Sequence, residues 1–497
     1  MTSATRTRAG AWRRLGVVVV ALTIGLGAGV LTSGTVSADD PFPKPVPQAR
    51  CGKGSNPETD IQGRVPRADY RSGRAAEGYT CNTKELAHEG GSGGFKVLRY
   101  TDEQGNTCAF YDNTLLFPRD VVNNLTTGQG TVVLDMNKPR RPVRTTTLDS
   151  PAMVSPHETL LVNRKRGLLA AVLGTAATYP GVLDVYDVSQ DCRDPQLLSS
   201  TLSGVLGHES GWSNDGLTFY SSSTVASLAA IDLTDPADPQ VLTTQWGVNY
   251  HGMRLSDDGR ILYAANIGDV GPTGVTDGGI AILDVSQVQD RVEEPEITIL
   301  SKLTWPEHSI PQVAEPFTRK GRHYVLEIDE FVDFFEATNA LAYPGSPVGV
   351  ARIIDVEDPT DPKVVSNIRL EVHQPENRAG DQLRDPGAWF PAQGYAGHYC
   401  SLPKRRNPKL AGCSMIASGL RLFDIRDVEH PREVGYFNKP LIPGGALKLP
   451  TLGGAYAMSA PAYDRRRGQV WYTDTNTGFY NVKLTNGLKK QSGRASC

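Results

Sequence analysis

The chain has 497 residues, of which 39% are apolar, 7% aromatic and 21% charged, and its formal net charge at pH 7 is −3. This length and composition are typical of a globular protein with a substantial core. No basic excess or basic stripe is present to neutralise phosphates, so the composition excludes a nucleic-acid partner.

The first 38 residues have the order of an export signal. A basic stretch precedes an apolar run from about Leu15 to Leu31, and small residues follow up to Ala38. We expect cleavage after Ala38 and a secreted or cell-surface protein with no stable membrane span. Loss of four arginines and no acidic residue would lower the net charge to −7. The alternative is an uncleaved anchor, because the apolar run is marginally long enough to span a bilayer.

A repeated unit of strands occupies most of the remaining chain. An apolar strand that ends in aspartate, followed by a polar, often proline-bearing turn and a second strand, recurs six times, and "TGFYNVKLTNG" is a degenerate seventh copy. The matching aspartates are Asp135, Asp187, Asp232, Asp284, Asp355 and Asp424. Upstream of each copy lies another pair of short strands joined by a turn, such as "SGWSNDGLTFYSS". Four short strands per unit predict the blade of a β-propeller.

The predicted fold class is therefore all-β, a single seven-bladed β-propeller of four-stranded blades over residues 88–497. The signature "LxxxD…DP…P" resembles that of the LVIVD repeat, a family of exported propeller-type proteins, and "LRLFDIRDVEHPREVG" at 420–435 is the copy most like it. The resemblance covers about residues 88–485. It implies a seven-bladed propeller and no single chemistry.

Closure of the ring requires a strand from elsewhere in the chain. The last unit shows three strands, and unpaired sheet edges are usually covered. We expect part of residues 40–80, within an N-terminal segment spanning 39–87, to return and complete the last blade. A disulfide from Cys497 to Cys51 or Cys81 would act as a clasp, and an unpaired Cys497 is the alternative.

Seven cysteines in an exported chain indicate disulfides, with one cysteine left over because the count is odd. Cys400 and Cys413 flank a short basic loop between two predicted adjacent strands, so they are the best-defined pair. The chain has no Cys-x-x-Cys spacing, which argues against a thioredoxin-like site or a zinc ribbon.

Histidines recur in phase with the blades. Six of the nine histidines stand just before the first strand of a unit: His88, His157, His208, His251, His308 and His398. First strands line the channel of a propeller and start at the same mouth, so these six imidazoles are expected in one ring. Because neighbouring strands are antiparallel, second strands end at this mouth. These positions, the neighbours of the histidines and the long loops supply the expected ligand-binding residues Glu158, Glu209, Asn266, Asp269, Glu327, Asp329, Trp389 and Tyr456.

Two interpretations of this ring remain open. In the first, neutral imidazoles bind a transition-metal ion or a substrate, and carboxylates orient the rings or act as a general base. In the second, each histidine braces its own blade, as the Gly-His pair of WD-repeat propellers does, and Gly207-His208 and Gly397-His398 fit that pattern. Long connections at 331–349, 372–397 and 438–456 reach the histidine mouth, two of them rich in aromatic residues, and favour a functional face with a covering lid.

We therefore predict an exported propeller of the LVIVD type whose histidine- and carboxylate-lined mouth binds a small ligand or a metal ion. A transition metal is the candidate cofactor, a small molecule or cell-surface ligand is the candidate partner, and no catalytic residue is assigned. One alternative is a metal-dependent oxidoreductase or hydrolase acting at this mouth with His157, His208, His251 and His308 as ligands. Another is a scaffold that binds protein or polysaccharide.

Other chemistries fit the pattern less well. A serine hydrolase is disfavoured because no alternation of strands and helices is present to carry a nucleophile elbow. The aspartates of turns such as "DVEDPTDP" are expected to cap their own backbone rather than bind calcium, since they recur wherever the chain turns tightly.

Overall fold

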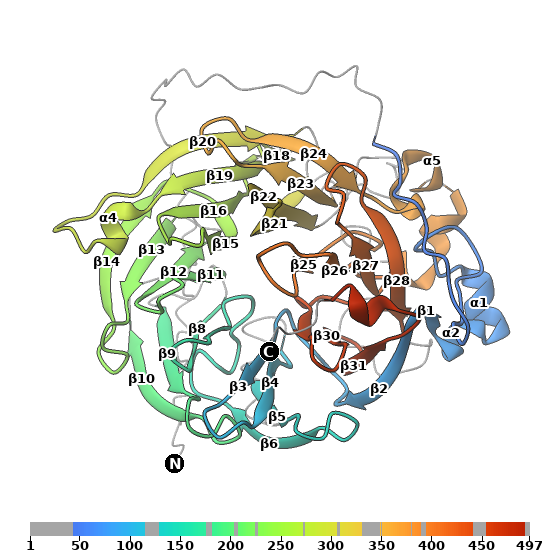
Figure 1. The fold of residues 1–497 in the computed structure, drawn as a ribbon, viewed down its shortest axis with the longest axis horizontal. Coiled ribbons are helices and arrows are strands. Elements are labelled where there is room, and N and C mark those ends of the chain that lie inside the picture. The colour runs from blue at the N-terminus through green and yellow to red at the C-terminus, as the bar shows by residue number, and fades with distance from the viewer. Residues whose placement is uncertain are drawn as a thin grey trace, which may run out of the picture. The chain divides into compact units, whose positions relative to one another are not determined.

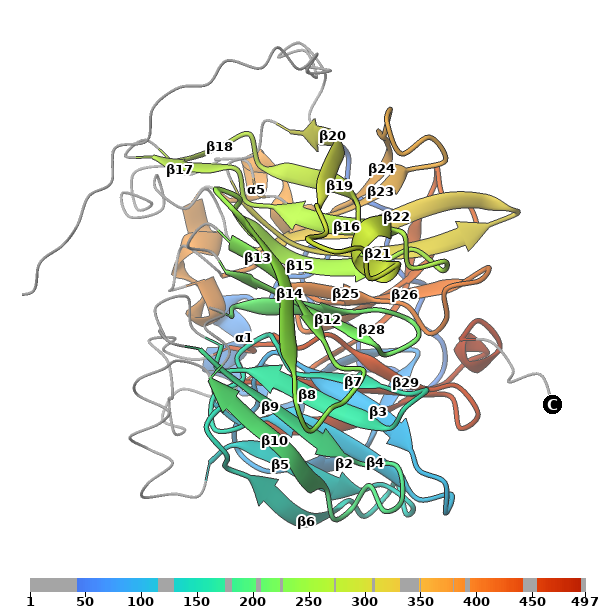
Figure 2. The same ribbon diagram turned by 90° about the vertical axis from the view of Figure 1, so that its left-hand side faces the viewer.

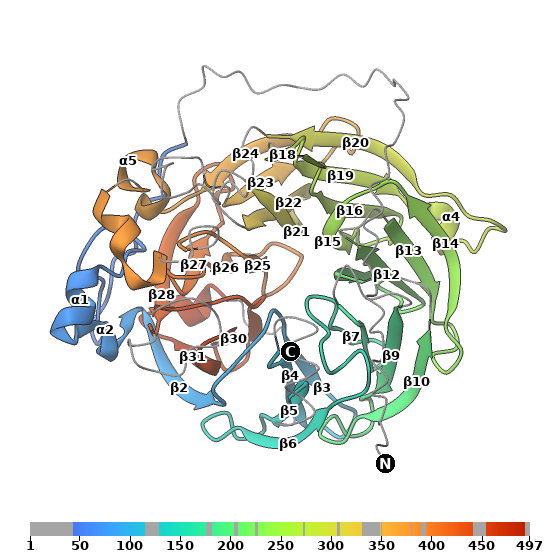
Figure 3. The same cartoon turned by 180° about the vertical axis from the view of Figure 1, so that it is seen from behind.

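A computed structural model describes residues 43–114, 129–174, 181–202, 207–223, 227–271, 274–305, 309–330, 348, 350–378, 380–388, 394–440 and 454–492. They belong to one compact unit, Gly34–Cys497. In this unit seven antiparallel sheets surround a central axis, seen from one side in Figure 1 and from the other in Figure 3. The predicted seven-bladed β-propeller is confirmed.

Blades 1 to 4 follow one another along the chain, each with its innermost strand first. Blade 1 contains β3 (Val97–Thr101), β4 (Thr107–Asp112), β5 (Thr131–Asp135) and β6 (Val143–Leu148). Blade 2 contains β7 (Leu161–Asn163), β8 (Leu168–Val172), β9 (Val182–Asp187) and β10 (Gln196–Leu202). Blade 3 contains β11 (Glu209–Trp212), β12 (Thr218–Ser223), β13 (Ser227–Asp232) and β14 (Gln240–Trp246). Blade 4 contains β15 (Tyr250–Leu255), β16 (Ile261–Asn266), β19 (Gly279–Asp284) and β20 (Thr298–Thr304).

Blades 6 and 7 each include a strand from the N-terminal part of the chain, whereas blade 5 does not. Blade 5 contains β21 (Ile310–Arg319), β22 (Arg322–Glu330), β23 (Ala351–Asp355) and β24 (Lys363–Ile368). Blade 6 contains β25 (Tyr399–Ser401), β26 (Leu410–Ser414), β27 (Leu420–Asp424), β28 (Arg432–Asn438) and β1 (Tyr79–Cys81). Blade 7 contains β29 (Ala462–Asp464), β30 (Gln469–Asp474), β31 (Gly478–Leu484) and β2 (Thr83–Glu89).

Short helices and one extra hairpin lie outside the blades. They are α1 (Arg67–Ser72), α2 (Arg74–Glu77), α4 (Ser286–Gln289), α5 (Pro375–Arg378), the 3-10 turns η2 (Glu371–His373), η3 (Gly380–Arg384), η4 (Pro386–Ala388) and η5 (Leu488–Lys490), and the hairpin β17 (Asp269–Gly271) with β18 (Gly274–Thr276). Figure 2 shows α1, α5 and the hairpin at the same end of the sheets. No helix in the described part of the chain is long and apolar enough to cross a membrane.

The six recurring aspartates each end the third strand of a blade. Apart from half-buried Val182, the preceding residues of these strands are buried, as in β5, where the first four of five residues are buried and Asp135 is half-buried at the end. In all six copies the aspartate Oδ1 accepts the backbone N–H of the residue two positions later, at 2.7–3.1 Å. The aspartates therefore cap turns, as predicted, and this is why the pattern is so regular along the sequence.

Apolar side chains fill the spaces between neighbouring blades. Strand β8, for example, is buried along its whole length. One cluster joins Val97 and Leu134 of blade 1 to Trp471 and Phe479 of blade 7, so the first and last blades pack against each other. The first strands of blades 4 and 5 approach especially closely, because a Cβ atom on Gly252 would lie only 2.4 Å from the carbonyl oxygen of Gln312.

Ring closure uses an N-terminal strand, but a different one from that expected. Strand β2 pairs with β31 and completes blade 7, whereas the prediction placed this strand within residues 40–80. The preceding strand β1 instead adds a fifth strand to blade 6 by pairing with β28. The successive strands β1 and β2 therefore belong to blades 6 and 7. The local sequence pattern does not show which of these two blades each strand joins.

Three disulfides join Cys51 to Cys81, Cys108 to Cys192 and Cys400 to Cys413. The predicted Cys400–Cys413 pair is confirmed, because the two residues face each other across β25 and β26. The predicted bond from Cys497 to Cys51 or Cys81 is wrong, since these two cysteines bond to each other. Cys497 itself lies outside the described residues.

The segment 43–82, here called the N-terminal strap, covers the outer edge of blade 6. Arg421 of β27 forms buried ion pairs with Glu58 of the strap and Glu433 of β28. The strap also contacts the connection between blades 5 and 6, since Arg64 Nε lies 2.8 Å from Asp385 Oδ2. The strap is thus joined to the chain segment that leads into His398.

Candidate metal centre

Four of the six in-phase histidines meet at one mouth of the channel. They are His157 before β7, His208 before β11, His251 at the second position of β15 and His398 before β25, and they belong to blades 2, 3, 4 and 6. Their rings adjoin one another, with centroids 4.5 Å apart for His157 and His208 and 4.7 Å apart for His208 and His251. Burial is nearly complete for His251 and His398, and high for His157.

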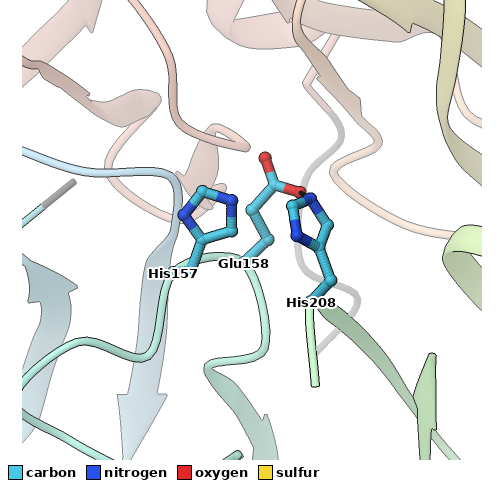
Figure 4. A group of neighbouring side chains, drawn as sticks. All are labelled: His157, Glu158 and His208. Atoms are coloured by element: carbon cyan, nitrogen blue, oxygen red, sulfur yellow. Dashed lines mark ion pairs between the residues drawn. The ribbon is translucent and has the colours of Figure 1, made fainter. Parts of the chain in front are cut away.

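The carboxylate of Glu158 lies among these rings. Its Oε2 is 2.9 Å from Nε2 of His251 and 3.6 Å from Nε2 of His208. Its Oε1 is 3.3 Å from Nε2 of His398. Figure 4 shows this carboxylate beside the rings of His157 and His208, and the ligand atoms of these three residues lie within 4.8 Å of one another. Imidazoles of three blades therefore converge on a single buried carboxylate.

Two of the rings are held by the main chain of the next blade. Nδ1–H of His251 donates to the carbonyl oxygen of Pro311 in blade 5 at 3.0 Å, and Nδ1–H of His398 donates to that of Met458, just before blade 7, at 2.6 Å. These bonds leave Nε2 of each ring directed at Glu158. These histidines therefore do brace the fold, as one of the two interpretations expected. They join neighbouring blades, whereas that interpretation had each histidine bond within its own blade. The same hydrogen bonds also orient the rings as metal ligands are usually oriented.

A second carboxylate stands beside the cluster. Oε2 of Glu330, the last residue of β22, is 3.3 Å from Nε2 of His398. The amide of Gln312 in β21 donates to Glu158 Oε1 at 2.5 Å. Glu330 follows the expected pair Glu327 and Asp329 along the same strand.

The buried charges shift one another's protonation. Burial raises the pKa of Glu158, but the charge of His251 and hydrogen bonds from His251 and His398 outweigh it and hold that pKa well below the usual range. Burial lowers the pKa of both histidines, yet the carboxylates outweigh it, so the pKa of His251 is raised and that of His398 reaches about 9. Burial and the neighbouring imidazoles keep the pKa of His208 well below its ordinary value. Without a bound cation, His398 is thus an imidazolium ion at neutral pH, and the carboxylates also favour the protonated form of His251.

His88 does not belong to this ring, contrary to the prediction. It lies on β2, the outermost strand of blade 7, where it is exposed and packs on Tyr480 at a centroid distance of 4.7 Å. The reason is that the strand around His88 pairs with the C-terminal strand β31 instead of preceding the first strand of blade 1. The in-phase position of blade 1 is occupied by Lys96, directly before β3.

Other expected ligand-binding residues have structural partners. Glu327 and Asp329 both pair with the buried guanidinium of Arg352, at 2.9 and 3.0 Å. Asn266 donates its amide to the carbonyl of Asp277 at 3.1 Å. Asp269 is exposed on the extra hairpin and is not among the grouped ligand atoms.

Glu209 and Tyr456 are buried near the channel. Glu209 forms an ion pair with Lys96, and the hydroxyl of Tyr399 donates to it at 3.0 Å. Tyr456 precedes the first strand of blade 7, which has no histidine at this point, and its backbone N–H donates to Asp474 at 2.6 Å. His308 and Trp389 lie outside the described residues.

Sequence reasoning missed Lys96 and Gln312. Lys96 could have been found by assigning the strand around His88 to blade 7, because Lys96 then stands where the other blades carry histidine. Gln312 gave no such signal, since a glutamine inside a strand is common on exposed sheets. A further candidate, Ser92 in "GGSGG", has the G-x-S-x-G spacing, but its hydroxyl donates to the carbonyl of Asn113 and a strand follows it instead of a helix.

The three remaining histidines are separate from the cluster. His373 is buried, where its Nδ1 accepts the N–H of Leu370 and its Nε2–H donates to the carbonyl of Tyr395. His323 and His430 are exposed and pair with Glu357 and Asp427 at 3.3 Å. Asp427 and Glu429 join His430 in a second group of potential ligand atoms, but all three side chains are exposed.

No protein-family model matches the sequence, and no curated protein matches it either. The solved structures that it resembles include a candidate 6-phosphogluconolactonase of Bacteroides fragilis, with 11% identity, a TM-score of 0.46, and coverage of 72% of this chain and 93% of that one. A candidate 6-phosphogluconolactonase of Bacteroides uniformis has 13% identity, a TM-score of 0.45, and coverage of 72% and 92%. Raptor of Chaetomium thermophilum has 11% identity, a TM-score of 0.44, and coverage of 85% and 31%. At these identities the likeness concerns the fold alone.

Proposed function

We propose that this protein binds one divalent transition-metal ion at the mouth of its channel, through His157, His208, His251 and Glu158. The observation that carries the proposal is the convergence of ligand atoms, since those of His157, Glu158 and His208 lie within 4.8 Å of one another and His251 Nε2 lies 2.9 Å from Glu158 Oε2. Imidazole and carboxylate are the ligands that zinc and related metals use in proteins.

The spacing suits an ion of this kind. Ligand atoms about 2.1 Å from a metal lie within about 4.2 Å of one another. The ligand atoms of His157, Glu158 and His208 lie within 4.8 Å, so side-chain shifts of less than about 1 Å would complete the site. In addition, Glu158 Oε2 and His251 Nε2 are buried and face each other at 2.9 Å. A cation could be held by both of these atoms in place of the proton between them.

The charge of the cluster also matches. Glu158 and Glu330 place two carboxylates beside the rings, which favours a cation over an anion at this site. Below it, Lys96 and Arg254 face Glu209 and Glu315, so that layer is already balanced. Residues 1–38 have the order of an export signal, and the three disulfides are typical of an exported protein. We therefore propose that the site belongs to an exported protein of the LVIVD type.

The proposal is tested by measuring bound metal. The purified chain with its disulfides intact would be stripped with a chelator, incubated separately with Zn²⁺, Co²⁺, Cu²⁺, Mn²⁺ and Fe²⁺, desalted and subjected to elemental analysis. We expect one ion per chain for at least one metal and its loss in the double variant His157→Ala/His208→Ala. The matched control His323→Ala/His430→Ala removes two exposed, carboxylate-paired histidines and should retain the ion. A wild-type chain without stoichiometric metal would refute the proposal.

A further inference from the structure

Next to the cluster of histidines, the side chain of Lys96 joins three blades across the channel. Its side chain is 1% exposed, and its Nζ forms an ion pair with Glu209 of blade 3. The same Nζ donates to the hydroxyl of Tyr399 in blade 6 at 2.9 Å and lies 4.0 Å from the centre of that ring. Lys96 itself precedes the first strand of blade 1. An amine this deeply buried has no solvent to replace either contact.

The two partners of Lys96 are the chain neighbours of two cluster histidines. Glu209 directly follows His208, and Tyr399 directly follows His398. The partners also bond to each other, since the Tyr399 hydroxyl donates to Glu209 Oε1 at 3.0 Å. Amine, carboxylate and phenol therefore form a closed triangle that spans the channel under the histidines.

Phe95, the residue before Lys96, contacts two rings of the histidine cluster. The ring of Phe95 packs edge-on against His157, with centroids 4.3 Å apart, and lies 5.4 Å from the ring of His398. Two consecutive residues of blade 1 thus contact the rings above and hold the polar triangle below. Blade 1 contributes no histidine of its own to the cluster.

Below the triangle, further charged side chains lie in the channel. Arg254 of blade 4 places Nη1 3.9 Å from Glu209 and Nε 2.9 Å from Glu315 of blade 5. Side chains of blades 1, 3, 4, 5 and 6 therefore meet on the axis under the cluster.

From these contacts we infer that Lys96 is a positioning residue of the metal centre. It fixes Glu209 and Tyr399 and thereby sets the separation of His208 and His398, which lie on opposite sides of the channel. This inference rests on the proposed function. Breaking a buried ion pair by removing one partner leaves the other charge uncompensated, so loss of Lys96 would release Glu209 and with it the backbone next to His208.

The test compares Lys96→Met and Lys96→Arg with the wild type. Metal affinity would be measured by competition with a chromophoric chelator, and ligand geometry by the visible absorption of the Co²⁺-loaded protein. Direct hydrogen-bond partners of metal ligands typically contribute about 10- to 100-fold to affinity, and Lys96 acts one residue further from the ligand, so about 10-fold is expected here. We expect Lys96→Met to bind one ion with affinity lowered by this factor and with an altered Co²⁺ spectrum, and Lys96→Arg to recover part of both.

Two further variants keep the test decisive. Tyr399→Phe removes only the hydroxyl of the triangle, so it tests the same contacts even if Lys96→Met does not fold. Its metal affinity and Co²⁺ spectrum should shift in the direction expected for Lys96→Met. Arg421→Met removes a buried cation that pairs with Glu58 and Glu433 outside the channel, so it should lower stability while leaving the Co²⁺ spectrum unchanged. Wild-type affinity and spectrum in Lys96→Met and Tyr399→Phe would overturn the positioning role alone. A wild-type chain that binds no metal would instead overturn the proposed function.

Discussion

Nε2 of His251 lies 2.9 Å from Oε2 of Glu158, although the two residues belong to different blades. On the other side of the same ring, Nδ1–H is bonded to the carbonyl of Pro311. One imidazole thus joins blade 4 to blade 5 and presents its second nitrogen to blade 2. The structural role that the sequence offered for this histidine and the ligand-binding role proposed above are therefore compatible in a single side chain.

Replacement of Glu158 should change the metal site while leaving the fold in place. In Glu158→Gln the imidazolium of His398 loses one of the two carboxylates that lie 3.3 Å from its Nε2, so we expect its pKa to fall from about 9 toward the ordinary value. Metal affinity should fall by more than the about 10- to 100-fold typical of an outer partner of a metal ligand. Histidine NMR titration and metal competition would check both, with Glu357→Gln beside exposed His323 as control. Retained metal binding would remove Glu158 from the ligand set.

Metal affinity should depend steeply on pH. The neighbouring carboxylates raise the pKa of His251, so in the absence of metal its ring holds a proton more tightly than an ordinary histidine does. A cation bound by Nε2 of His251 must displace this proton, so affinity should rise from pH 6 to pH 9, with release of up to about one proton per ion at pH 7. Calorimetry in buffers of different ionisation enthalpy would measure this release. Binding without proton release would place the ion elsewhere.

His373 should make the protein sensitive to acid. Burial lowers its pKa to about 3, whereas an unfolded histidine titrates near 6.5. The unfolded chain therefore binds the proton more readily, so this group's contribution to stability is complete above pH 6.5 and is lost as the pH falls toward 3. Between pH 7 and pH 4 the loss is about 3 kcal/mol. Urea unfolding at both values should show a smaller difference for His373→Gln, and an unchanged difference would contradict this assignment.

The disulfide of the N-terminal strap should stabilise the whole ring. Cys51 and Cys81 are separated by 30 residues, and closing a loop of this size corresponds to about 3.5 kcal/mol of unfolded-state entropy. The strap supplies β1 to blade 6, so its release would expose the edge of β28. Cys51→Ala/Cys81→Ala should lower the free energy of unfolding by about this amount. Cys497→Ala, which leaves the described disulfides intact, should not. Equal stability of all three proteins would show that the strap holds without its disulfide.

The parts of the fold that could be predicted are those encoded locally. An apolar run that ends in Asp135 or Asp424 specifies both a buried strand and the turn that caps it, within a few residues. Repetition of that unit then defines the ring, and the phase of His157, His208 and His251 within the unit places them at one mouth. No long-range pairing had to be known for either conclusion.

The errors concern residues whose position depends on distant partners. The strand around His88 looks like the entrance to blade 1, and only its pairing with β31 assigns it to blade 7. Cysteine pairing has the same character, since connectivity does not follow from spacing. Lys96 was overlooked because a lysine before an apolar strand usually lies in solvent, and only its burial against Glu209 and Tyr399 shows otherwise.

Gly252 should be required for both packing and metal binding. It follows His251, and a Cβ atom there would lie 2.4 Å from the carbonyl oxygen of Gln312, whose side chain bonds Glu158. Gly252→Ala must push blades 4 and 5 apart, at a cost of about 1–3 kcal/mol of stability, and should weaken metal binding by moving His251 away from Glu158. Gly91→Ala, where a Cβ meets nothing within 4 Å, is the matched control. If Gly252→Ala lost stability but bound metal as tightly as the wild type, His251 would not be a ligand, because its displacement would then leave the ion unaffected.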